Sequence, residues 1–430
     1  MKEALASLAD RYTHAVIASI GDDGYPLSVA TAFRADVERG VLRLDRPAGA
    51  PVRDGLQVNV LFSHIRPQAG IGYDERRYVS LWGPMRVTDD ALEISAERVE
   101  QWDEKQVPFF EYCERAVPRA RRYMAELSRH SGDEVRPWLS TGWLFVRATR
   151  LPFLTATLVS VLLGLAIATL IAACAVHLGL NVANDVFDTL SGADAANVTP
   201  TPFSGGSRVI VYGLLSTAQM IALCAACYGV GLGIGLYLAV ERGFWPLVAI
   251  GAAGAFVSLA YTAPPLRLVH RGLGEIAVAL GFGPIMTVGA YYVEAQRFSW
   301  EALYASLPGG ILIALVLYVN EIPDRRGDAR AGKRTLPVRL TRETVIAGYG
   351  GAVALAFALI GVGAVVGIIA RASIIALAAA PLAGSVYRAL QRSYDDPYAL
   401  MPAMARNIQL HLATGMLLVS GYLIRLAFAG

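Results

Sequence analysis

Long apolar runs, separated by short polar segments, fill the chain from about residue 153 to its end. Each later run is long enough to cross a bilayer as one helix, which takes roughly 20 residues. The first run has 35 residues, which is too long for one span, and we interpret it as a short hairpin that brings the total to about nine spans. The runs cover residues 153–187, 211–240, 244–261, 274–293, 304–320, 344–369, 372–388 and 408–427.

The first 130 residues follow a different pattern, with short stretches rich in β-branched and aromatic residues. These stretches predict strands at residues 14–20, 26–33, 41–45, 57–63 and 77–87. An Asp-Gly pair lies between the first two and is typical of a hairpin turn. Residues 90–130 carry apolar residues among charges and predict helix. Several short strands followed by helices indicate a small β barrel with helical additions.

Composition changes at the same place as the pattern. Of the first 150 residues, 43 are Asp, Glu, Lys or Arg, against 30 of the remaining 280. Such a step marks a domain boundary. We expect a soluble domain at residues 1–140 and an all-α polytopic membrane bundle at residues 141–430. A single soluble domain, a disordered chain and a disulfide-rich scaffold are excluded.

The overall charge and the cysteines add little. The net charge is +3, and no basic block indicates nucleic acid. Cys224 and Cys227 form a CxxC inside an apolar run without partner ligands, so we interpret them as small apolar residues. The first residues are charged and contain no apolar segment, so we expect no cleavable signal peptide.

Cationic residues favour one side of the predicted bundle. The loops 188–213, 262–273, 322–342 and 387–407 hold 13 Lys and Arg residues. The opposite side has only four, at Arg242, Arg297, Arg371 and Arg425. By the positive-inside rule, the first set of loops is cytoplasmic and the N-terminal domain lies on the same side of a cell membrane.

The few acidic residues of the membrane part gather in two segments where an apolar run meets a cationic loop. The segments begin at Asn184 and at Asn320, and they contain six of the thirteen carboxylates beyond residue 150. Each has Asn and Asp four positions apart, which places both side chains on one helical face. Carboxylates at a membrane helix end are costly unless they serve a ligand. We therefore predict a site formed by Asn184, Asp185, Asp188, Asp194, Asn320, Asp324 and Asp328.

Two acidic clusters facing one cavity repel each other unless cations lie between them. Carboxylate and amide oxygens suit Mg²⁺, which readily shares its shell with substrate phosphates. Paired clusters, Mg²⁺ and a diphosphate form a sensible site for ionising an allylic diphosphate, because the metal neutralises the leaving group.

Four segments in order resemble the UbiA superfamily of intramembrane prenyltransferases. NVANDVFDTLSGAD at 181–194 and VNEIPDRRGDARAGKRTLPVRL at 319–340 resemble its two Asp-rich motifs. TPFSGGSRVI at 201–210 and YTAPPLRLVHRGLGE at 261–275 resemble its loops. The phrases GLGEIAVALGFGPIMTVGAYYV and AGKRTLPVRL are most similar to the menaquinone branch, which prenylates 1,4-dihydroxy-2-naphthoate.

The resemblance implies roles for particular residues. It assigns Asn184, Asp185, Asp188 and Asp194 to one Mg²⁺, and Asn320, Asp324 and Asp328 to another. It assigns Arg208 and Lys333, one of only three lysines, to the diphosphate. It assigns Tyr261 and Arg267 to the acceptor. Asp188, Asp324 and Lys333 are then the catalytic residues, which draw off diphosphate from a polyprenyl donor while an aromatic acceptor attacks at carbon.

Two departures leave the acceptor open. Glu321-Ile-Pro323 replaces the Asn-Ile-Arg that is more usual in the menaquinone branch, and the YTAPP loop is more like other branches. Another phenol, a chlorin or a glycerol phosphate lipid therefore stays an alternative acceptor to a dihydroxynaphthoate.

The N-terminal segment resembles the pyridoxamine-phosphate-oxidase-like split barrel, a family that often binds FMN or a related flavin. The phrases ASIGDDGYPLSVATAF and VNVLFSHIRP carry this resemblance. The basic and hydroxyl side chains that could hold a flavin phosphate are Arg43, Arg53, Ser63, His64 and Arg66. The resemblance leaves open a membrane-anchored flavin oxidoreductase acting on a quinone, and a barrel without cofactor that docks a soluble partner.

Overall fold

The computed structural model describes residues 5–20, 26–47, 53–68, 72–135, 140–154, 157–158 and 167–428. The chain forms two compact units, Met1–Cys113 and Glu114–Gly430. The division lies inside the helix α3 (Phe109–Ser131), directly after Cys113. The predicted boundary between residues 140 and 141 rests on the step in composition, and it stays a prediction.

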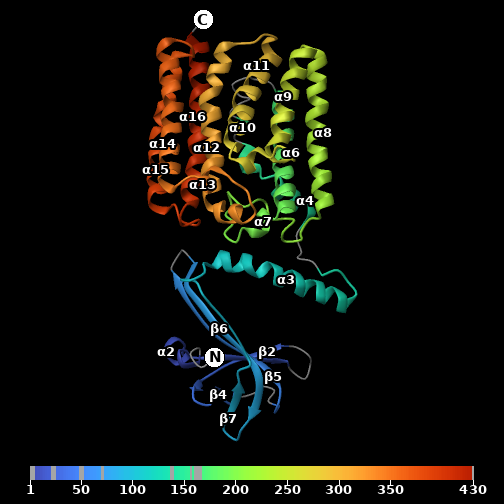
Figure 1. Cartoon of the computed structure of the whole chain (residues 1–430), viewed down its shortest axis with the longest axis vertical. Coiled ribbons are helices and arrows are strands. Elements are labelled where there is room, and N and C mark those ends of the chain that lie inside the picture. The colour runs from blue at the N-terminus through green and yellow to red at the C-terminus, as the bar shows by residue number, and fades with distance from the viewer. Residues whose placement is uncertain are drawn as a thin grey trace. The chain divides into compact units, whose positions relative to one another are not determined.

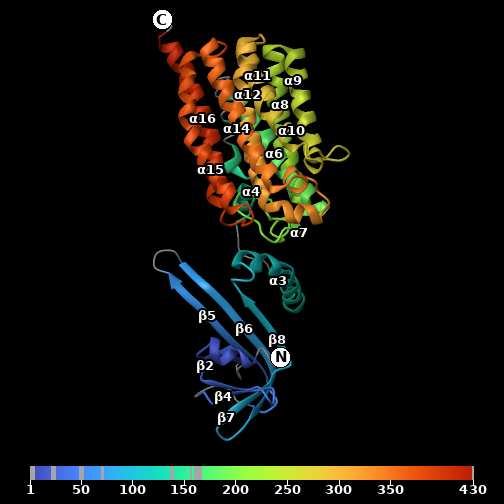
Figure 2. The same ribbon diagram turned by 60° about the vertical axis from the view of Figure 1, so that its left-hand side comes forward.

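The first unit is built on an antiparallel sheet with the strand order β2-β1-β5-β6-β7-β4-β3, and β8 also pairs with β6. The long strands β5, β6 and β8 run side by side (Figure 2). A core of fully buried side chains, among them Phe62, Leu81 and Ile94, supports the sheet. The elements are α2 (Leu8–Arg11), β1 (Ala15–Ile20), β2 (Pro26–Thr31), β3 (Phe33–Asp36), β4 (Val41–Asp45), β5 (Gln57–Gln68), β6 (Gly72–Val87), β7 (Ala91–Ser95) and β8 (Arg98–Asp103).

The strand predictions hold with extended ends, but the helix predicted over 90–130 is wrong in its first part. Residues 91–95 and 98–103 are strands, and helix begins only at Phe109. Leu92 and Ile94 are fully buried and lie opposite Leu44 and Leu42 of β4. Pairing with β4 and β6 thus makes these residues strands, although their local spacing also fits a helix. The predicted strand 26–33 also divides, because Phe33 begins β3.

The second unit is a helical bundle (Figure 1). Within the described residues, eight helical segments are long and apolar enough to span a membrane. The helical elements after α3 are α4 (Thr141–Ala148), η1 (Leu151–Leu154), α6 (Ile167–Ser191), α7 (Ala193–Ala196), α8 (Thr217–Arg242), α9 (Phe244–Thr262), η2 (Leu268–Arg271), α10 (Gly274–Leu280), η3 (Gly281–Ile285), α11 (Met286–Ala295), α12 (Trp300–Arg330), α13 (Leu336–Arg339), α14 (Arg342–Val366), η4 (Arg371–Ala379), α15 (Ala380–Ser393) and α16 (Met401–Phe428).

The ninth predicted span is the first arm of the hairpin at 153–187. The second arm is present as α6, which runs past residue 187 to Ser191. Most of the first arm, residues 155–156 and 159–166, lies outside the described residues. The hairpin therefore stays a prediction.

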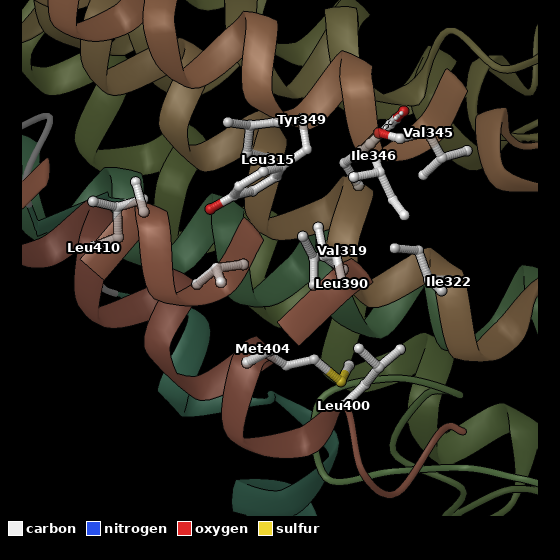
Figure 3. Close-up of a cluster of buried hydrophobic side chains, with 14 of the residues drawn as sticks. Leu315, Val319, Ile322, Val345, Ile346, Tyr349, Leu390, Leu400, Met404 and Leu410 are labelled. Carbon is white, nitrogen blue, oxygen red and sulfur yellow. Dashed lines mark hydrogen bonds between the residues drawn. The ribbon is translucent and has the colours of Figure 1, made fainter. Parts of the chain in front are cut away.

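A cluster of buried hydrophobic side chains packs against the C-terminal half of α12. Leu315, Val319 and Ile322 of α12 pack against side chains of α14, α15 and α16 (Figure 3). A polar link crosses this cluster: the Tyr349 hydroxyl donates to Asn407 Oδ1 at 3.0 Å, and Asn407 Nδ2 donates to the Leu315 carbonyl at 2.8 Å. Buried polar groups with satisfied hydrogen bonds fix one packing arrangement, so α12 is held firmly where its acidic residues begin.

Both acidic segments come at the same end of the bundle. The α6 segment leads into α7, and the α12 segment leads toward α13. In both views α7 lies at the end of the bundle away from the C-terminus (Figures 1 and 2). The chain order and the helix directions therefore bring the two segments to the same end, as expected from their position beside the cationic loops.

Candidate active site

The first acidic cluster occupies the last two turns of α6. Asn184 Nδ2 donates to Asp188 Oδ2 at 3.0 Å, which confirms that the two side chains share a helical face. Gly192 has a left-handed backbone with φ of 81° and ends the helix. The short helix α7 then returns Asp194 toward this face, where Thr189 Oγ1 donates to its Oδ2 at 3.3 Å. The cluster therefore combines one helix end with a tight turn.

The second acidic cluster lies on the continuous helix α12. The prediction that Asp328 continues the stack required the helix to pass Pro323, and it does, because α12 ends only at Arg330. Asp324 is fixed by two donors from the other side of the site: Asn197 Nδ2 at 2.8 Å and the Gly205 backbone N–H at 2.9 Å. Asn197 was not identified from the sequence, because no spacing relates it to Asp324.

One glycine-containing loop holds carboxylates of both clusters. Gly205 N–H donates to Asp324, and Ser207 N–H donates to Asp185 Oδ2 at 3.0 Å. Gly206 between them has φ of +71°, and a Cβ there would lie 3.0 Å from Asp194 Oδ1 and 3.1 Å from Asp185 Oδ1. Glycine is therefore required by both backbone and space. This explains physically why the segment 201–208 accompanies the acidic motifs.

Lys333 joins the two clusters. Its Nζ lies 3.2 Å from Asp188 Oδ2 and 3.7 Å from Asp328 Oδ1, and only 9% of its side chain is exposed. Burial lowers the pKa of Lys333, but Asp188 and Asp328 outweigh burial and raise it well above its ordinary value. The amine is therefore a cation that lies between carboxylates of the two clusters.

Asp194 lies at the edge of the same charge cluster. Burial, followed by the Asp188 and Asp185 carboxylates, raises the pKa of Asp194 well above its ordinary value. Like charges brought together in a buried site favour binding of a proton or a cation. Both clusters thus concentrate negative charge beyond what Lys333 alone balances.

The donor set fits Mg²⁺. Five buried side-chain oxygens of the predicted metal ligands have no hydrogen-bond partner among the described residues, although each belongs to a group that binds hard cations well. No three carboxylate, histidine or cysteine side chains of the described residues are close enough to hold one ion by themselves. An ion held here by a few carboxylate and amide oxygens would keep other oxygen ligands, as Mg²⁺ commonly does. The five oxygens are Asn184 Oδ1, Asp185 Oδ1, Asp188 Oδ1, Asn320 Oδ1 and Asp328 Oδ2.

A polar cavity of about 140 Å³ lies between the clusters. Asp185 lies next to this cavity, where its carboxylate accepts a hydrogen bond from the Ser207 N–H. Residues in the lining that the sequence analysis did not assign to the site include Arg150, Asn181 and the buried Glu321. The predicted site residues in the lining are Asn184, Asp188, Asp194, Asn320, Asp324, Asp328, Lys333 and Tyr261.

Three predicted site residues do not line this cavity: Asp185, which is held by the Ser207 N–H, Arg208 and Arg267. Arg208 is buried behind the first cluster, where its guanidinium donates to the Asp194 carbonyl and to Glu114. Arg267 is exposed in the loop before η2. Their predicted contacts with diphosphate and acceptor stay predictions.

A second cavity of about 480 Å³ adjoins the polar one and is lined mainly by apolar residues of α6, α8, α9, α10, η3 and α11. The two cavities share five lining residues, which form a neck between them. The neck includes aromatic rings from three elements. The imidazole ring of His177 lies 4.5 Å from the ring of Phe282, centroid to centroid. The shared residues are His177, Leu180, Tyr261, Val278 and Phe282.

Two of the residues predicted to hold a flavin, Arg43 and His64, lie at different ends of β6. Arg43 on β4 pairs with Glu93 at 3.1 Å. His64 on β5 lies 3.7 Å from Glu75, and Ser63 precedes it. Arg43 lies opposite Glu93 of β7, which in turn lies opposite Arg86 of β6. His64 lies opposite Arg77 of β6. Nine positions along a strand correspond to about 30 Å, so Arg43 and His64 are well separated along β6, and the predicted flavin phosphate site stays a prediction. Arg53 lies in the loop before β5.

Comparison with known proteins finds relatives of the second unit. The family model of the UbiA prenyltransferase family matches residues 141–411. A 2-carboxy-1,4-naphthoquinone phytyltransferase of Synechocystis is 27% identical over 297 residues, which are 66% of this chain and 94% of the relative. A 1,4-dihydroxy-2-naphthoate octaprenyltransferase of Mycobacterium tuberculosis is 37% identical over 178 residues, which are 41% of this chain and 58% of the relative.

Among solved structures, a UbiA homologue of Archaeoglobus fulgidus bound to GPP and Mg²⁺ has a TM-score of 0.45 and 15% identity, and the match covers 64% of this chain and 99% of that chain. The eight candidate spans and the paired acidic clusters define a multi-pass helical membrane protein with a polar site at one end of its helices. The family match extends over more than half of the chain. The chain belongs to the UbiA prenyltransferase family.

Proposed function

We propose that the chain transfers a polyprenyl group from its diphosphate to an aromatic acceptor of the dihydroxynaphthoate type, as a step of quinone synthesis. The observation that carries the proposal is the convergence of two Asn/Asp clusters on one buried polar cavity that adjoins a large apolar cavity. A diphosphate ester of an isoprenoid has the same two parts, a polyanion and an apolar tail. Relatives that act on naphthoate-type acceptors support the choice of acceptor class.

The polar cavity holds the diphosphate. Asn184, Asp185, Asp188 and Asp194 would hold one Mg²⁺, and Asn320, Asp324 and Asp328 the other; bound Mg²⁺ supplies charge neutralisation for the leaving diphosphate. The Lys333 amine is already poised between the clusters and pairs with diphosphate oxygens when they enter. Arg150, at the edge of the cavity, adds a second cation there.

The apolar cavity holds the isoprenoid tail and excludes water from the reacting carbon. The carbon–oxygen bond of the allylic diphosphate breaks at the neck, and its electron pair leaves with the diphosphate. The aromatic rings of Tyr261 and Phe282 face a carbon that is becoming positive, and such faces attract cations. A carbon of the acceptor ring forms the new bond, and the ring then loses a proton, or carbon dioxide if a carboxylate occupied that carbon.

The acceptor is the least constrained part of this proposal. Glu321 is 5% exposed and lines the polar cavity beside Tyr261, where the menaquinone branch more often has Asn. A carboxyl there accepts a hydrogen bond from a hydroxyl of the molecule to be prenylated, which suits a phenolic ring. A different phenol, a chlorin or a glycerol phosphate lipid would still use the same diphosphate chemistry.

We also propose a cellular side for the site and a cofactor for the first unit. The cationic loops support a cytoplasmic side for the acidic clusters and for the N-terminal unit of a cell-membrane protein. A split barrel that binds FMN is supported only by the strand-rich sequence pattern. An absorbance spectrum of the purified full-length chain tests it: a flavin gives bands in the visible range, and a colourless protein contradicts the assignment.

The proposed activity is tested by supplying membranes that contain the full-length chain with Mg²⁺, a radiolabelled polyprenyl diphosphate and one candidate acceptor at a time. We expect a labelled lipid product with the dihydroxynaphthoate. Asp188→Asn and Asp324→Asn should each lower its formation by about 100-fold or more. Glu241→Gln is the matched control, because Glu241 is exposed at the end of α8.

Two outcomes contradict the proposal. One is full transfer by both Asp variants. The other is a redox reaction with quinone that both Asp variants retain while no acceptor is prenylated, because that result would make the protein a flavin oxidoreductase.

A further inference from the structure

A helix from outside the family-matched region contacts the site. The match begins at residue 141, whereas Glu114 belongs to α3, which ends at Ser131. Glu114 Oε2 accepts a hydrogen bond from Arg208 Nη2 at 2.6 Å, and its other oxygen accepts from the Tyr212 hydroxyl. The two side chains of the ion pair are 9% and 5% exposed. This is a buried, charge-assisted contact rather than a surface pair.

Arg208 carries this contact toward the acidic cluster. Its second terminal nitrogen donates to the backbone carbonyl of Asp194. The residue also has a left-handed backbone, with φ of +65°, which is unusual for a side chain of this kind. Arg208 thus links Glu114 on one side to the turn that carries Asp194 on the other.

Two further side chains hold the same loop from outside. Arg121 Nη1, also on α3, donates to the Val211 carbonyl at 3.1 Å. Arg147 Nε donates to the Ser207 carbonyl at 3.1 Å. The inner side of this loop donates backbone N–H groups to Asp185 and Asp324. A shift of the loop therefore moves ligand oxygens of both clusters.

We propose that Glu114 is a positioning residue for the Mg²⁺-binding clusters, acting through Arg208; this inference rests on the proposed function. While Glu114 is present, the Arg208 guanidinium is neutralised and directed at a carbonyl. Without Glu114, a buried cation loses its partner, which is strongly unfavourable. The guanidinium then turns to the nearest carboxylates, those of the first cluster, and competes with the metal for them.

The test measures metal binding directly on the full-length chain in lipid nanodiscs. Mn²⁺ is titrated in the presence of inorganic pyrophosphate, and the free ion is followed by its electron paramagnetic resonance signal. Loss of a partner that orients metal ligands commonly costs 10- to 100-fold in affinity. We expect Glu114→Ala to weaken Mn²⁺ binding about tenfold. Glu126→Gln is the control, because Glu126 is exposed on the same helix.

Two further variants separate positioning from folding. Glu114→Gln keeps the shape and should weaken Mn²⁺ binding less than Glu114→Ala does. The double variant Glu114→Ala with Arg208→Ala should bind no worse than Arg208→Ala alone, because residues that act through one another are not additive. In transfer assays, the Mg²⁺ concentration for half-maximal rate should rise about tenfold, with a smaller loss of rate at saturating Mg²⁺.

The failures are distinguishable. If the wild-type chain prenylates an acceptor and Glu114→Ala binds Mn²⁺ as tightly as the wild type, or more tightly, only this inference is overturned. If no acceptor is prenylated but Mn²⁺ binding weakens as expected, the proposed function fails and the positioning role stands. Additive losses in the double variant also overturn the inference.

Discussion

The two acidic clusters share one spacing but are built differently. The α12 cluster lies on a continuous helix backed by the buried core that α14, α15 and α16 form around Val319 and Tyr349. The α6 cluster is split by the Gly192 turn, so Asp194 depends on loop contacts, including the one from Arg208. The same ligand chemistry can thus be supported by a helix core or by a loop. The loop-supported cluster should be the one that distant residues can tune.

The largest expected effect comes from the loop that serves both clusters. Gly206→Ala places a Cβ about 3.0 Å from Asp194 Oδ1 in a left-handed backbone, so the first cluster must give way or the loop, which also holds Asp324, must shift. We expect prenyl transfer to fall about 100-fold. The rate is measured at saturating Mg²⁺ and donor.

Gly367→Ala is the matched control for this prediction. Gly367 has a similar φ of +82°, but nothing lies within 4 Å of its added Cβ. It should lose only stability, by about 1–2 kcal/mol. Equal rate losses in both glycine variants would show that backbone strain alone, and not the carboxylates, explains the effect.

A smaller effect is expected from the support of the α12 cluster. Asn197→Ala removes the 2.8 Å hydrogen bond to Asp324 but leaves the Gly205 N–H in place. We expect a loss of about tenfold in transfer rate. Asn197→Asp should lose more, because it adds a negative charge beside Asp324. The reverse order of the two variants would contradict this account of Asn197.

The smallest effect on activity should come from the core behind α12. Tyr349→Phe removes the donor to Asn407 and leaves a buried carbonyl oxygen without it, which costs about 1–3 kcal/mol of stability. The melting temperature should fall while transfer stays within about twofold of the wild type. A tenfold loss of activity would mean that this core controls the site rather than only supporting its helix.

Much of the site was predictable because its signal is local. Asn184 with Asp188, and Asn320 with Asp324, are related by one helical turn, and apolar runs locate the helices that carry them. Glu114 and Asn197 could not be found in this way, because they contact residues 94 and 127 positions away. Nothing in their neighbourhood distinguishes them from other polar loop or helix residues.

The first unit shows the same limit for the fold. Its first hairpin, β1 with β2, is predictable from strand-rich runs and a turn pair, since the two strands are neighbours in sequence. The sequence of β7 and β8 predicts helix, because Leu92, Ile94, Val99 and Trp102 lie among charged residues at a spacing that a helix also accommodates. Their conformation is decided by pairing with β4 and β6, which local sequence does not encode.

The central claim is that both clusters bind a single diphosphate together. It is tested most directly by calorimetric titration of geranyl thiodiphosphate, a poor donor, into the full-length chain in nanodiscs with Mg²⁺. We predict binding that disappears with EDTA and weakens at least about tenfold in each of Asp188→Asn and Asp324→Asn. Unchanged affinity in either variant would contradict the claim, because one cluster alone would then suffice.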